Sequence, residues 1–348
     1  MWLVYHLGAR AILAPVRFKL LPLPALLTAW LAMLLALLPG FAGAQVDKTF
    51  RVGVIKFVSH PALDADEKGF EAALAHSGFK EGVNLEILRH DAQGDPARAE
   101  AAARALIGAQ VDLIHTIATP STQAAVQVAK AVPIVFSAVT DPLSAGVVPS
   151  HVPPGQKTGT LITGVSDMWP IRQQLEAYSR ALPQVKRWGT VYNPQEANSV
   201  RHLQILRQAA SKLGLSLLEV HVSKGAEVAA AAQSLVGRVE AILHTADNTT
   251  AANLDALIKV CEQHRIPLFA GDIESVPQGA IAAYGNDYFL VGYAAGKKAS
   301  LVLKGVKPGS IPWGPVEKYS LVVNAKAVKA MGARLPAGFL GLADRVID

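Results

Sequence analysis

Apolar and polar residues follow two alternating patterns along the chain from Phe50 to the C-terminal end. Short apolar runs rich in β-branched residues predict strands, and segments with apolar residues every three or four positions predict helices. Continuous apolar strands separated by helices are typical of parallel sheets covered on both faces, so the fold class is α/β. The predicted strands are Arg51–Val58, Asn84–His90, Asp112–Ala118, Pro133–Val139, Thr160–Val165, Trp188–Asn193, Ser216–Val222, Ala241–Thr245, Pro267–Ala270, Ala280–Tyr284 and Tyr319–Val323. Predicted helices include Ala62–Ser77, Pro96–Ala109, Pro120–Ala131 and Gln195–Leu213.

The order of these elements repeats once. A strand with His115-Thr116, a helix, an apolar strand and Asp141 form one series, and a strand with His244-Thr245, a helix, an apolar strand and Asp272 form a second. Such a repeat predicts two doubly wound, Rossmann-like lobes with a hinge and a cleft between them. We expect residues 50–164 plus 286–305 in the first lobe and residues 165–285 plus 306–348 in the second. The helix Asp287–Leu303 would then return to the first lobe.

The first 44 residues read as an export signal. Arg10, Arg17 and Lys19 precede or flank an apolar stretch from Leu20 to Leu38, and small residues follow at 42 and 44. This order is that of a secretory signal peptide cleaved after Ala44, although about 20 apolar residues could also form an uncleaved membrane anchor. Cleavage would leave 304 of the 348 residues, a periplasmic protein that starts at Gln45.

Charge and cysteine content exclude several classes of protein. The net charge of +6 falls to +3 without the three basic residues of the signal, which argues against a nucleic-acid partner. Cys261 is the only cysteine and lies in an apolar-periodic helix, so we expect a buried thiol and no disulfide within the chain. No nucleotide-binding, metal-ligand or nucleophile-elbow motif occurs, so the sequence predicts neither a cofactor nor a metal nor an enzyme.

Ligands of doubly wound sheets bind at the carboxyl ends of the strands, so the residues that follow the strands are the candidates for a site. These residues are Phe57, Ser59, Thr119, Ser121, Thr140, Asp141, Tyr192, Asn193, Asp247, Asn248 and Asp272. Thr119 before Pro120 could cap a helix whose free N–H groups hold a carboxylate, or could cap the helix and nothing more. Asp141 and Asp272 could meet a ligand ammonium, but aspartates there are also ordinary turn residues.

Several short strings, in order, resemble the ABC transporter substrate-binding family that includes tryptophan- and tyrosine-binding receptors. The strings are Phe57-Val58-Ser59-His60-Pro61, Ile117-Ala118-Thr119-Pro120, Thr140-Asp141-Pro142, Thr163-Gly164-Val165-Ser166-Asp167 and Asp247-Asn248. The resemblance implies a type I periplasmic-binding fold and delivery of a solute to a membrane permease with a separate ATPase. It also adds Asp167 to the residues that would line the cleft. The segment Gly271-Asp272-Ile273-Glu274 departs from the small, hydroxyl-rich residues that the resemblance leads us to expect.

The sequence thus predicts a monomeric solute-binding receptor of an ABC importer, with a free amino acid, aromatic rather than aliphatic, in the cleft. A buried zwitterion needs both charges matched. Its carboxylate would lie at the helix start Thr119–Thr122, its ammonium at Asp141, Asp247 or Asp272, and its side chain near Phe57 or Tyr192. A solute sensor for a signalling partner and an exported enzyme that uses the same cleft are the alternatives.

Overall fold

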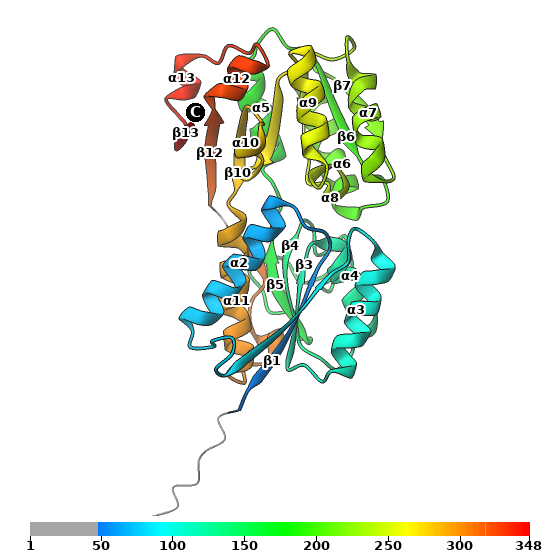
Figure 1. The fold of residues 1–348 in the computed structure, drawn as a ribbon, viewed down its shortest axis with the longest axis vertical. Helices are drawn as coiled ribbons and strands as arrows, with labels where there is room; N and C mark the ends of the chain where they lie inside the picture. The colour runs from blue at the N-terminus through cyan, green and yellow to red at the C-terminus, as the bar shows by residue number, and fades with distance from the viewer. Residues whose placement is uncertain (1–47, 317) are drawn as a thin grey trace, which may run out of the picture. The chain divides into compact units, whose positions relative to one another are not determined.

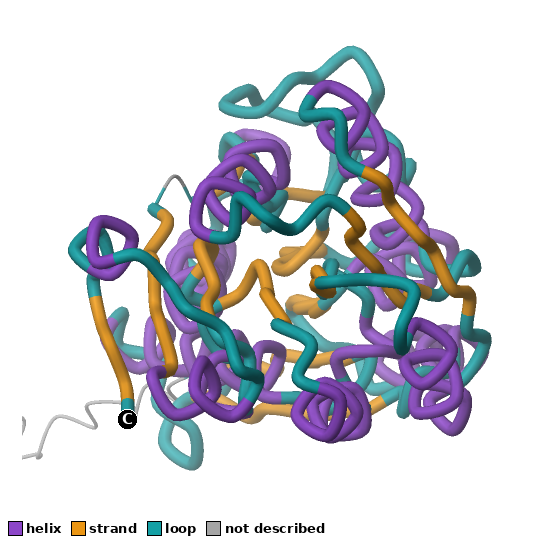
Figure 2. The backbone as a smooth tube through the Cα atoms, turned by 90° about the horizontal axis from the view of Figure 1, so that it is seen from above, coloured by secondary structure: helices purple, strands orange, loops and turns teal. Residues whose placement is uncertain are grey.

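The computed structural model describes residues 48–316 and 318–348, so the predicted signal peptide lies outside the described residues. Lys48–Asp348 form one compact unit that contains two sheets, and helices surround the strands of both (Figures 1 and 2). The first sheet has the order β11-β5-β4-β3-β1-β2 and the second the order β13-β12-β10-β9-β8-β6-β7. Five strands of each sheet therefore follow the same winding, which agrees with the repeat in the sequence.

The strands of the first sheet are buried wherever their apolar runs are continuous, as β3, β4 and β5 are throughout. All pairings between its neighbours are parallel. Its strands are β1 (Phe50–Lys56), β2 (Leu85–Asp91), β3 (Leu113–Ile117), β4 (Ile134–Val139), β5 (Ile162–Ser166) and β11 (Gly314–Pro315). The helices of this lobe are α2 (Pro61–His76), α3 (Pro96–Gly108), α4 (Thr119–Val128) and α11 (Tyr288–Leu303).

The second sheet has a parallel centre and one antiparallel pair, between β10 and β12. Its strands are β6 (Arg187–Tyr192), β7 (Ser216–His221), β8 (Ala241–Leu243), β9 (Leu268–Asp272), β10 (Ala282–Asn286), β12 (Tyr319–Asn324) and β13 (Arg345–Ile347). The helices of this lobe are α5 (Ile171–Ala181), α6 (Ala197–Lys212), α7 (Val228–Leu235), α8 (Asn248–Ala251), α9 (Leu254–His264), α10 (Ser275–Gln278), α12 (Ala325–Ala330) and α13 (Ala337–Leu340). Two single turns of 3₁₀ helix are η1 (Gly225–Glu227) and η2 (Pro308–Ser310).

Two details differ from the expected division of the chain. Because Gly314 and Pro315 pair with Val165 and Ser166, the segment that ends at β11 belongs to the first sheet, whereas we expected all of 306–348 in the second lobe. For the same reason Val165 and Ser166 lie in the first sheet, and the crossing to the second begins at Asp167. Cys261 is fully buried in α9, and burial raises the pKa of its thiol to about 12.

Helices α2 and α11 pack against each other through glycines, side by side in Figure 1. A Cβ atom on Gly292 of α11 would lie 1.8 Å from the carbonyl oxygen of Asp66, and one on Gly69 of α2 would lie 2.0 Å from that of Phe289. The two backbones approach more closely than any side chain would allow. This contact fixes the position of both helices, and the N-terminal ends of both lie at the cavity described next.

Candidate functional site

Residues at the carboxyl ends of both sheets line one internal cavity. The first sheet contributes Ala138, Thr140 and Asp167, and the second contributes His244, Asp247 and Asp272. The free space is about 30 Å³, which is room for roughly one water molecule. A ligand of amino-acid size therefore requires the lobes to move apart or the lining side chains to move.

Asp167 is the most unusual group of the cavity. Its side chain is buried, and Oδ2 accepts a hydrogen bond from the hydroxyl of Tyr288, which itself accepts one from Nε1 of Trp169 at 3.2 Å. The other oxygen, Oδ1, is buried and has no hydrogen-bond partner among the described residues. Burial raises the pKa of Asp167 to about 6, and the hydroxyl groups of Tyr288 and Thr140 limit the rise. The cavity thus holds a carboxylate whose charge is only partly compensated.

Two histidines face the same cavity from different lobes. His60 precedes α2, and His244 follows β8; Nε2 of the first and Nδ1 of the second are buried without a partner among the described residues. Burial lowers the pKa of His60 to about 4 and that of His244 to about 3, so both rings are neutral at pH 7. A neutral imidazole offers one donor and one acceptor, which suits a polar ligand of either kind.

Helix α2 begins at the cavity. Ala62 and Leu63 line it, and their backbone N–H groups, at the second and third positions of the helix, have no partner among the described residues. His60 stands at the N-cap position but makes no side-chain capping bond. The free N–H groups and the dipole of this 16-residue helix attract negative charge.

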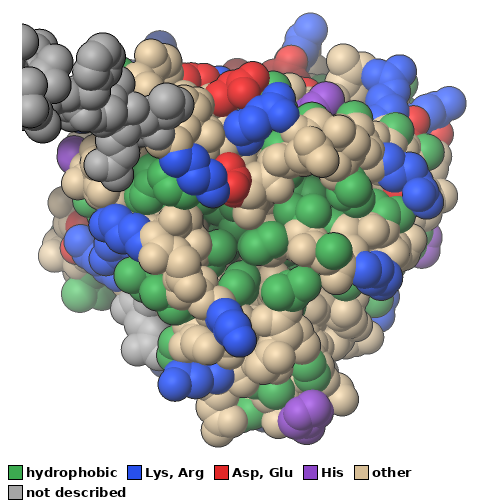
Figure 3. Space-filling view, turned by 90° about the horizontal axis from the view of Figure 1, so that it is seen from below, with side chains coloured by type: hydrophobic (Ala, Val, Ile, Leu, Met, Phe, Trp, Pro, Cys, Tyr) green, Lys and Arg blue, Asp and Glu red, His purple; other side chains and the backbone are tan. Residues whose placement is uncertain are grey.

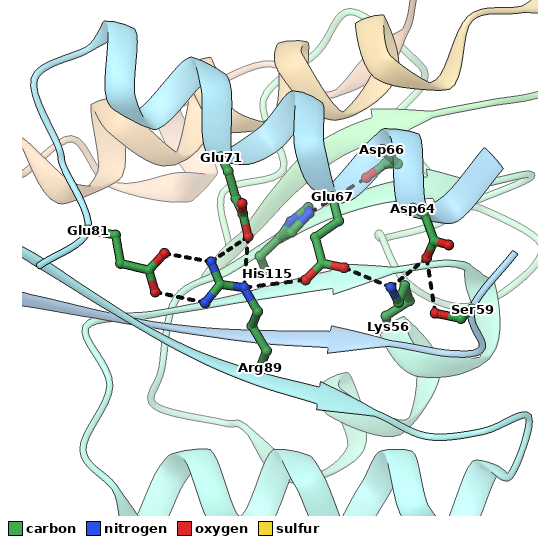
Figure 4. A network of polar contacts seen from close by, with 9 residues as sticks. All are labelled: Lys56, Ser59, Asp64, Asp66, Glu67, Glu71, Glu81, Arg89 and His115. Carbon is green, nitrogen blue, oxygen red and sulfur yellow. Dashed lines mark hydrogen bonds and ion pairs between the residues drawn. The ribbon is translucent and has the colours of Figure 1, made fainter. Parts of the chain in front are cut away.

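A network of ion pairs on its exposed side holds α2 against the first two strands (Figure 4). Nζ of Lys56 on β1 donates to Asp64 at 2.6 Å and to Glu67 at 2.8 Å. Arg89 on β2 continues the network to Glu67, Glu71 and Glu81, with ion-pair distances of 3.7, 2.6 and 2.7 Å. Because both strands are held in a sheet, this network fixes where α2 starts relative to the cavity.

The start of α8, which follows β8 in the second lobe, is already filled by the protein's own carboxylates. Glu196 accepts hydrogen bonds from the backbone N–H groups of Asn248 at 3.0 Å and Thr249 at 2.9 Å, and Asp247 accepts one from Thr250 at 2.6 Å. Asp247 also accepts from the backbone of Asn193 at 2.6 Å. Helix α8 therefore has no N–H group left for a ligand in its first turn.

A larger groove of about 690 Å³ lies next to the cavity, and Asn248 lines both. Phe57, Pro120 and Gln123 line this groove from the first lobe, and Asn193 and Thr249 line it from the second. The groove is lined mainly by polar and small residues, which come from both lobes. It offers space that the cavity itself lacks.

The structure distributes the predicted site residues over three places. Lining the cavity are Thr140, Asp167, Asp247, Asn248 and Asp272, and lining the adjacent groove are Phe57, Asn193 and again Asn248. Elsewhere lie Ser59, which is exposed, Thr119 and Ser121, which are buried, and Asp141 and Tyr192.

The three aspartates expected to meet an ammonium all have partners within the protein. Asp141 forms an ion pair with Arg201 of α6 at 2.8 Å, a link between the lobes. Asp247 caps α8, and Asp272 accepts hydrogen bonds from the backbone and hydroxyl of Ser275 at 2.8 Å. Each therefore has less need of a ligand cation than Oδ1 of Asp167.

The helix start at Thr119 and the ring of Tyr192 also lie differently from the expectation. Ala118, with φ of 82°, occupies the N-cap position, and Thr119 is the first residue of α4, where its hydroxyl accepts a bond from the N–H of Thr140 at 3.3 Å. The hydroxyl of Tyr192 lies 2.8 Å from Nε2 of His221, outside the cavity. Neither residue reaches the cavity.

Among the lining residues that were not predicted, five have polar or aromatic side chains: His60, Trp169, Asn198, His244 and Tyr288. His60 and Trp169 stand one and two positions from the predicted Ser59 and Asp167, so proximity in sequence was a usable signal for both. Tyr288 opens a helix more than 100 positions later, and only the return of α11 to the first lobe brings it to the cavity.

Two negative findings concern the described residues. Within 48–316 and 318–348 no cluster of three or more His, Cys, Asp or Glu side chains is arranged to hold a metal ion. Over the same ranges no helix has the length and apolar content needed to cross a bilayer. Lys and Arg side chains are dispersed among apolar and uncharged ones on the face shown in Figure 3 and form no continuous basic patch there.

A family model described as ABC transporter substrate binding protein matches residues 51–347. The chain belongs to this family. Members of the ABC transporter substrate-binding family are solute-binding proteins and not enzymes, as the sequence predicted, and they generally work outside the cytoplasm with ABC permeases. The type I periplasmic-binding fold of its structural neighbours confirms the predicted fold class.

Three relatives of this substrate-binding protein are informative. It is 35% identical, over 82% of its own length and 81% of the other's, to a tyrosine-binding protein of Clostridioides difficile. A domain from Streptococcus pneumonia solved in complex with L-Trp is 31% identical, with a TM-score of 0.81 over 86% of this chain and 100% of that one. A ligand-free, open substrate-binding protein with adhesive properties from Clostridium difficile is 32% identical, with a TM-score of 0.63 over 86% and 99%.

Proposed function

We propose that this protein is an exported, periplasmic receptor that captures a free amino acid between its two lobes and delivers it to a permease for import. The observation that carries the proposal is the cavity itself, which pairs an undercompensated carboxylate with an open helix start. The ammonium of a zwitterion suits the carboxylate, and its own carboxylate suits the helix start. A sugar has no charge for either group, and an anion suits the helix start alone.

The relatives support an aromatic amino acid. One relative is named for tyrosine, and another was solved with L-Trp. In this chain, the ring of Trp169 lines the cavity and packs 5.1 Å from the ring of His202, so an aromatic surface already borders the space. Planar side chains pack favourably on such rings.

Closure of the two lobes over the ligand is part of the proposal. The chain superposes better on the L-Trp complex than on the ligand-free, open structure, although the two identities, 31% and 32%, are nearly equal. The ion pair between Asp141 and Arg201 joins the lobes on one side of the cleft. We therefore propose two lobes that hinge at the segments between the sheets and close on the solute as a monomer.

The decisive test is titration calorimetry of the mature protein, stripped of bound solute by denaturation and refolding, against the twenty amino acids. We expect an aromatic amino acid to bind most tightly. If none binds more tightly than about 100 μM while a sugar, nucleoside or purely anionic solute does, the amino-acid function is wrong. If an aliphatic amino acid binds best, only the aromatic part is wrong.

The proposed location is tested separately. Because the small residues at 42 and 44 form a cleavage site, N-terminal sequencing of protein from the periplasm should give Gln45 as the first residue. An intact Met1, or membrane retention that salt does not release, would contradict export in soluble form.

A further inference from the structure

We infer that Asp167, and not one of the aspartates that follow β4, β8 or β9, binds the ammonium of the ligand, while the start of α2 binds its carboxylate. This assignment rests on the proposed amino-acid function and gives the ligand one orientation in the cavity. It makes Asp167 a specificity-determining residue and Tyr288 a positioning residue.

The carboxylates around the cavity differ in how many of their oxygens already accept hydrogen bonds from the protein. Asp247 accepts bonds from Asn193, Ser199 and Thr250, and Asp272 accepts from Ser275, so their carboxylates are satisfied by the protein. Asp167 accepts a hydrogen bond from Tyr288, and the nearby hydroxyl of Thr140 also favours its charged form, but Oδ1 is buried without a partner at hydrogen-bond geometry among the described residues. An unpaired buried carboxylate oxygen is costly, and a ligand ammonium would remove that cost.

Asp167 is held in place by neutral groups, and none of them cancels the charge of its carboxylate. The backbone carbonyl of Asp167 accepts a bond from Nδ2 of Asn286 at 2.9 Å, and Oδ2 is fixed by Tyr288, which Trp169 supports. All of these donors are uncharged. The carboxylate is thus oriented by neutral groups, which leaves its charge for a cation from outside.

The start of α2 is the best-placed group for the ligand carboxylate. Among the helix starts near the cleft, α8 is filled by Glu196 and Asp247, and the first residues of α4 do not line the cavity. Helix α6 reaches the cavity at Asn198, but Glu196 stands at its N-cap position, and that carboxylate disfavours a second negative charge there. Helix α2 offers the unbonded N–H groups of Ala62 and Leu63 directly at the cavity. Asp167 directly follows β5 of the lobe that carries this open helix start, so both charges of the ligand would be bound at the first-lobe side of the cavity.

The test uses the aromatic amino acid that the wild-type protein binds most tightly, with L-tyrosine and L-tryptophan as the first probes. In Asp167→Asn the shape is kept and the charge is lost, and we expect affinity to fall by about tenfold or more. Asp272→Asn, at the competing carboxylate of the same cavity, should weaken binding less than Asp167→Asn does, since the Asp272 carboxylate accepts hydrogen bonds from Ser275. Tyr288→Phe should weaken binding less than Asp167→Asn does.

A readout of ligand chemistry separates recognition from structural damage. Wild-type protein should bind the analogue without the ammonium, 3-(4-hydroxyphenyl)propanoate or indole-3-propanoate, far more weakly than the amino acid. Asp167→Asn should lose most of this discrimination, while Tyr288→Phe should retain it. The wild-type comparison needs no variant and stands even if Asp167→Asn does not fold.

The outcomes are distinct. If the wild type binds an amino acid but Asp167→Asn binds it equally well, or if the wild type does not discriminate against the analogue, the assignment is wrong and the proposed function stands. If Asp272→Asn loses affinity and discrimination instead, the ammonium lies at Asp272. If the wild type binds no amino acid at all, the proposed function and the assignment both fail.

Discussion

The close contact between α2 and α11 gives a prediction whose size follows from the structure. Replacing Gly292 by alanine would place a Cβ atom 1.8 Å from the carbonyl oxygen of Asp66. Real Cβ contacts do not fall below 3.0 Å, so the helices must separate locally by about 1.2 Å. The obstructing atom belongs to the backbone of a helix and cannot rotate away.

The cost of Gly292→Ala follows from two opposing effects. Overpacking of a tight interface costs about 1–3 kcal/mol, and a gap of an ångström elsewhere along the interface loses a substantial part of its dispersion energy. Alanine in a helix is more favourable than glycine by about 1 kcal/mol, which offsets part of this. We therefore expect a net loss of about 1–2 kcal/mol, which for the folded unit Lys48–Asp348 is a fall in Tm of roughly 2–3 °C.

Thermal unfolding followed by circular dichroism measures the effect, with Gly108→Ala as the matched control. Gly108 ends α3, and a Cβ atom there meets nothing within 4 Å, so the control should unfold at the same temperature as the wild type or slightly above it. If Gly292→Ala unfolds no earlier than Gly108→Ala, the close approach of α2 and α11 does not limit the packing, and the reasoning is wrong.

Two further predictions concern conditions and closure. Ligand affinity should fall as pH drops below about 6, because Asp167 then takes up a proton and loses its attraction for an ammonium. Calorimetry at pH 7.5 and pH 5 would show the fall, and equal affinities would contradict it. Arg201→Gln should weaken binding by less than about fivefold, since its ion pair with Asp141 is partly exposed, and a loss beyond about fiftyfold would show that this pair controls closure.

The sequence predicted the strands and the repeat well because both depend on local patterns. Every predicted strand is present within a few residues, and five strands of each lobe follow the repeated order. The strands it missed, β11 and β13, have two and three residues, too few for a period to show. Their pairing depends on partners far away in the chain, Val165 for β11 and Val322 for β13.

The site was harder to predict than the fold because it depends on which side chains pair with each other in the folded chain. The sequence shows that Asp141 follows a strand, but its ion pair with Arg201 lies 60 positions ahead and depends on how the lobes meet. Likewise Thr119-Pro120 has the local form of a cap, yet Ala118 takes the N-cap position with a positive φ that only the surrounding structure can enforce. Which carboxylate stays unpaired is a property of the folded neighbourhood and has no local signature.

Two of the segments that join the two sheets are connected at Asp167. This residue opens the first crossing, directly after β5, while Asn286 and Tyr288 flank the second, between β10 and α11, and both donate to Asp167. Two of the segments at which the lobes would hinge are thus linked through Asp167, whose backbone carbonyl accepts from Asn286 and whose carboxylate accepts from Tyr288. A solute that changes the charge or position of the Asp167 carboxylate acts directly on the hinge, because recognition and hinge motion involve the same residue. Solutes of similar affinity that place different charges at Asp167 should therefore restrict the hinge motion to different degrees.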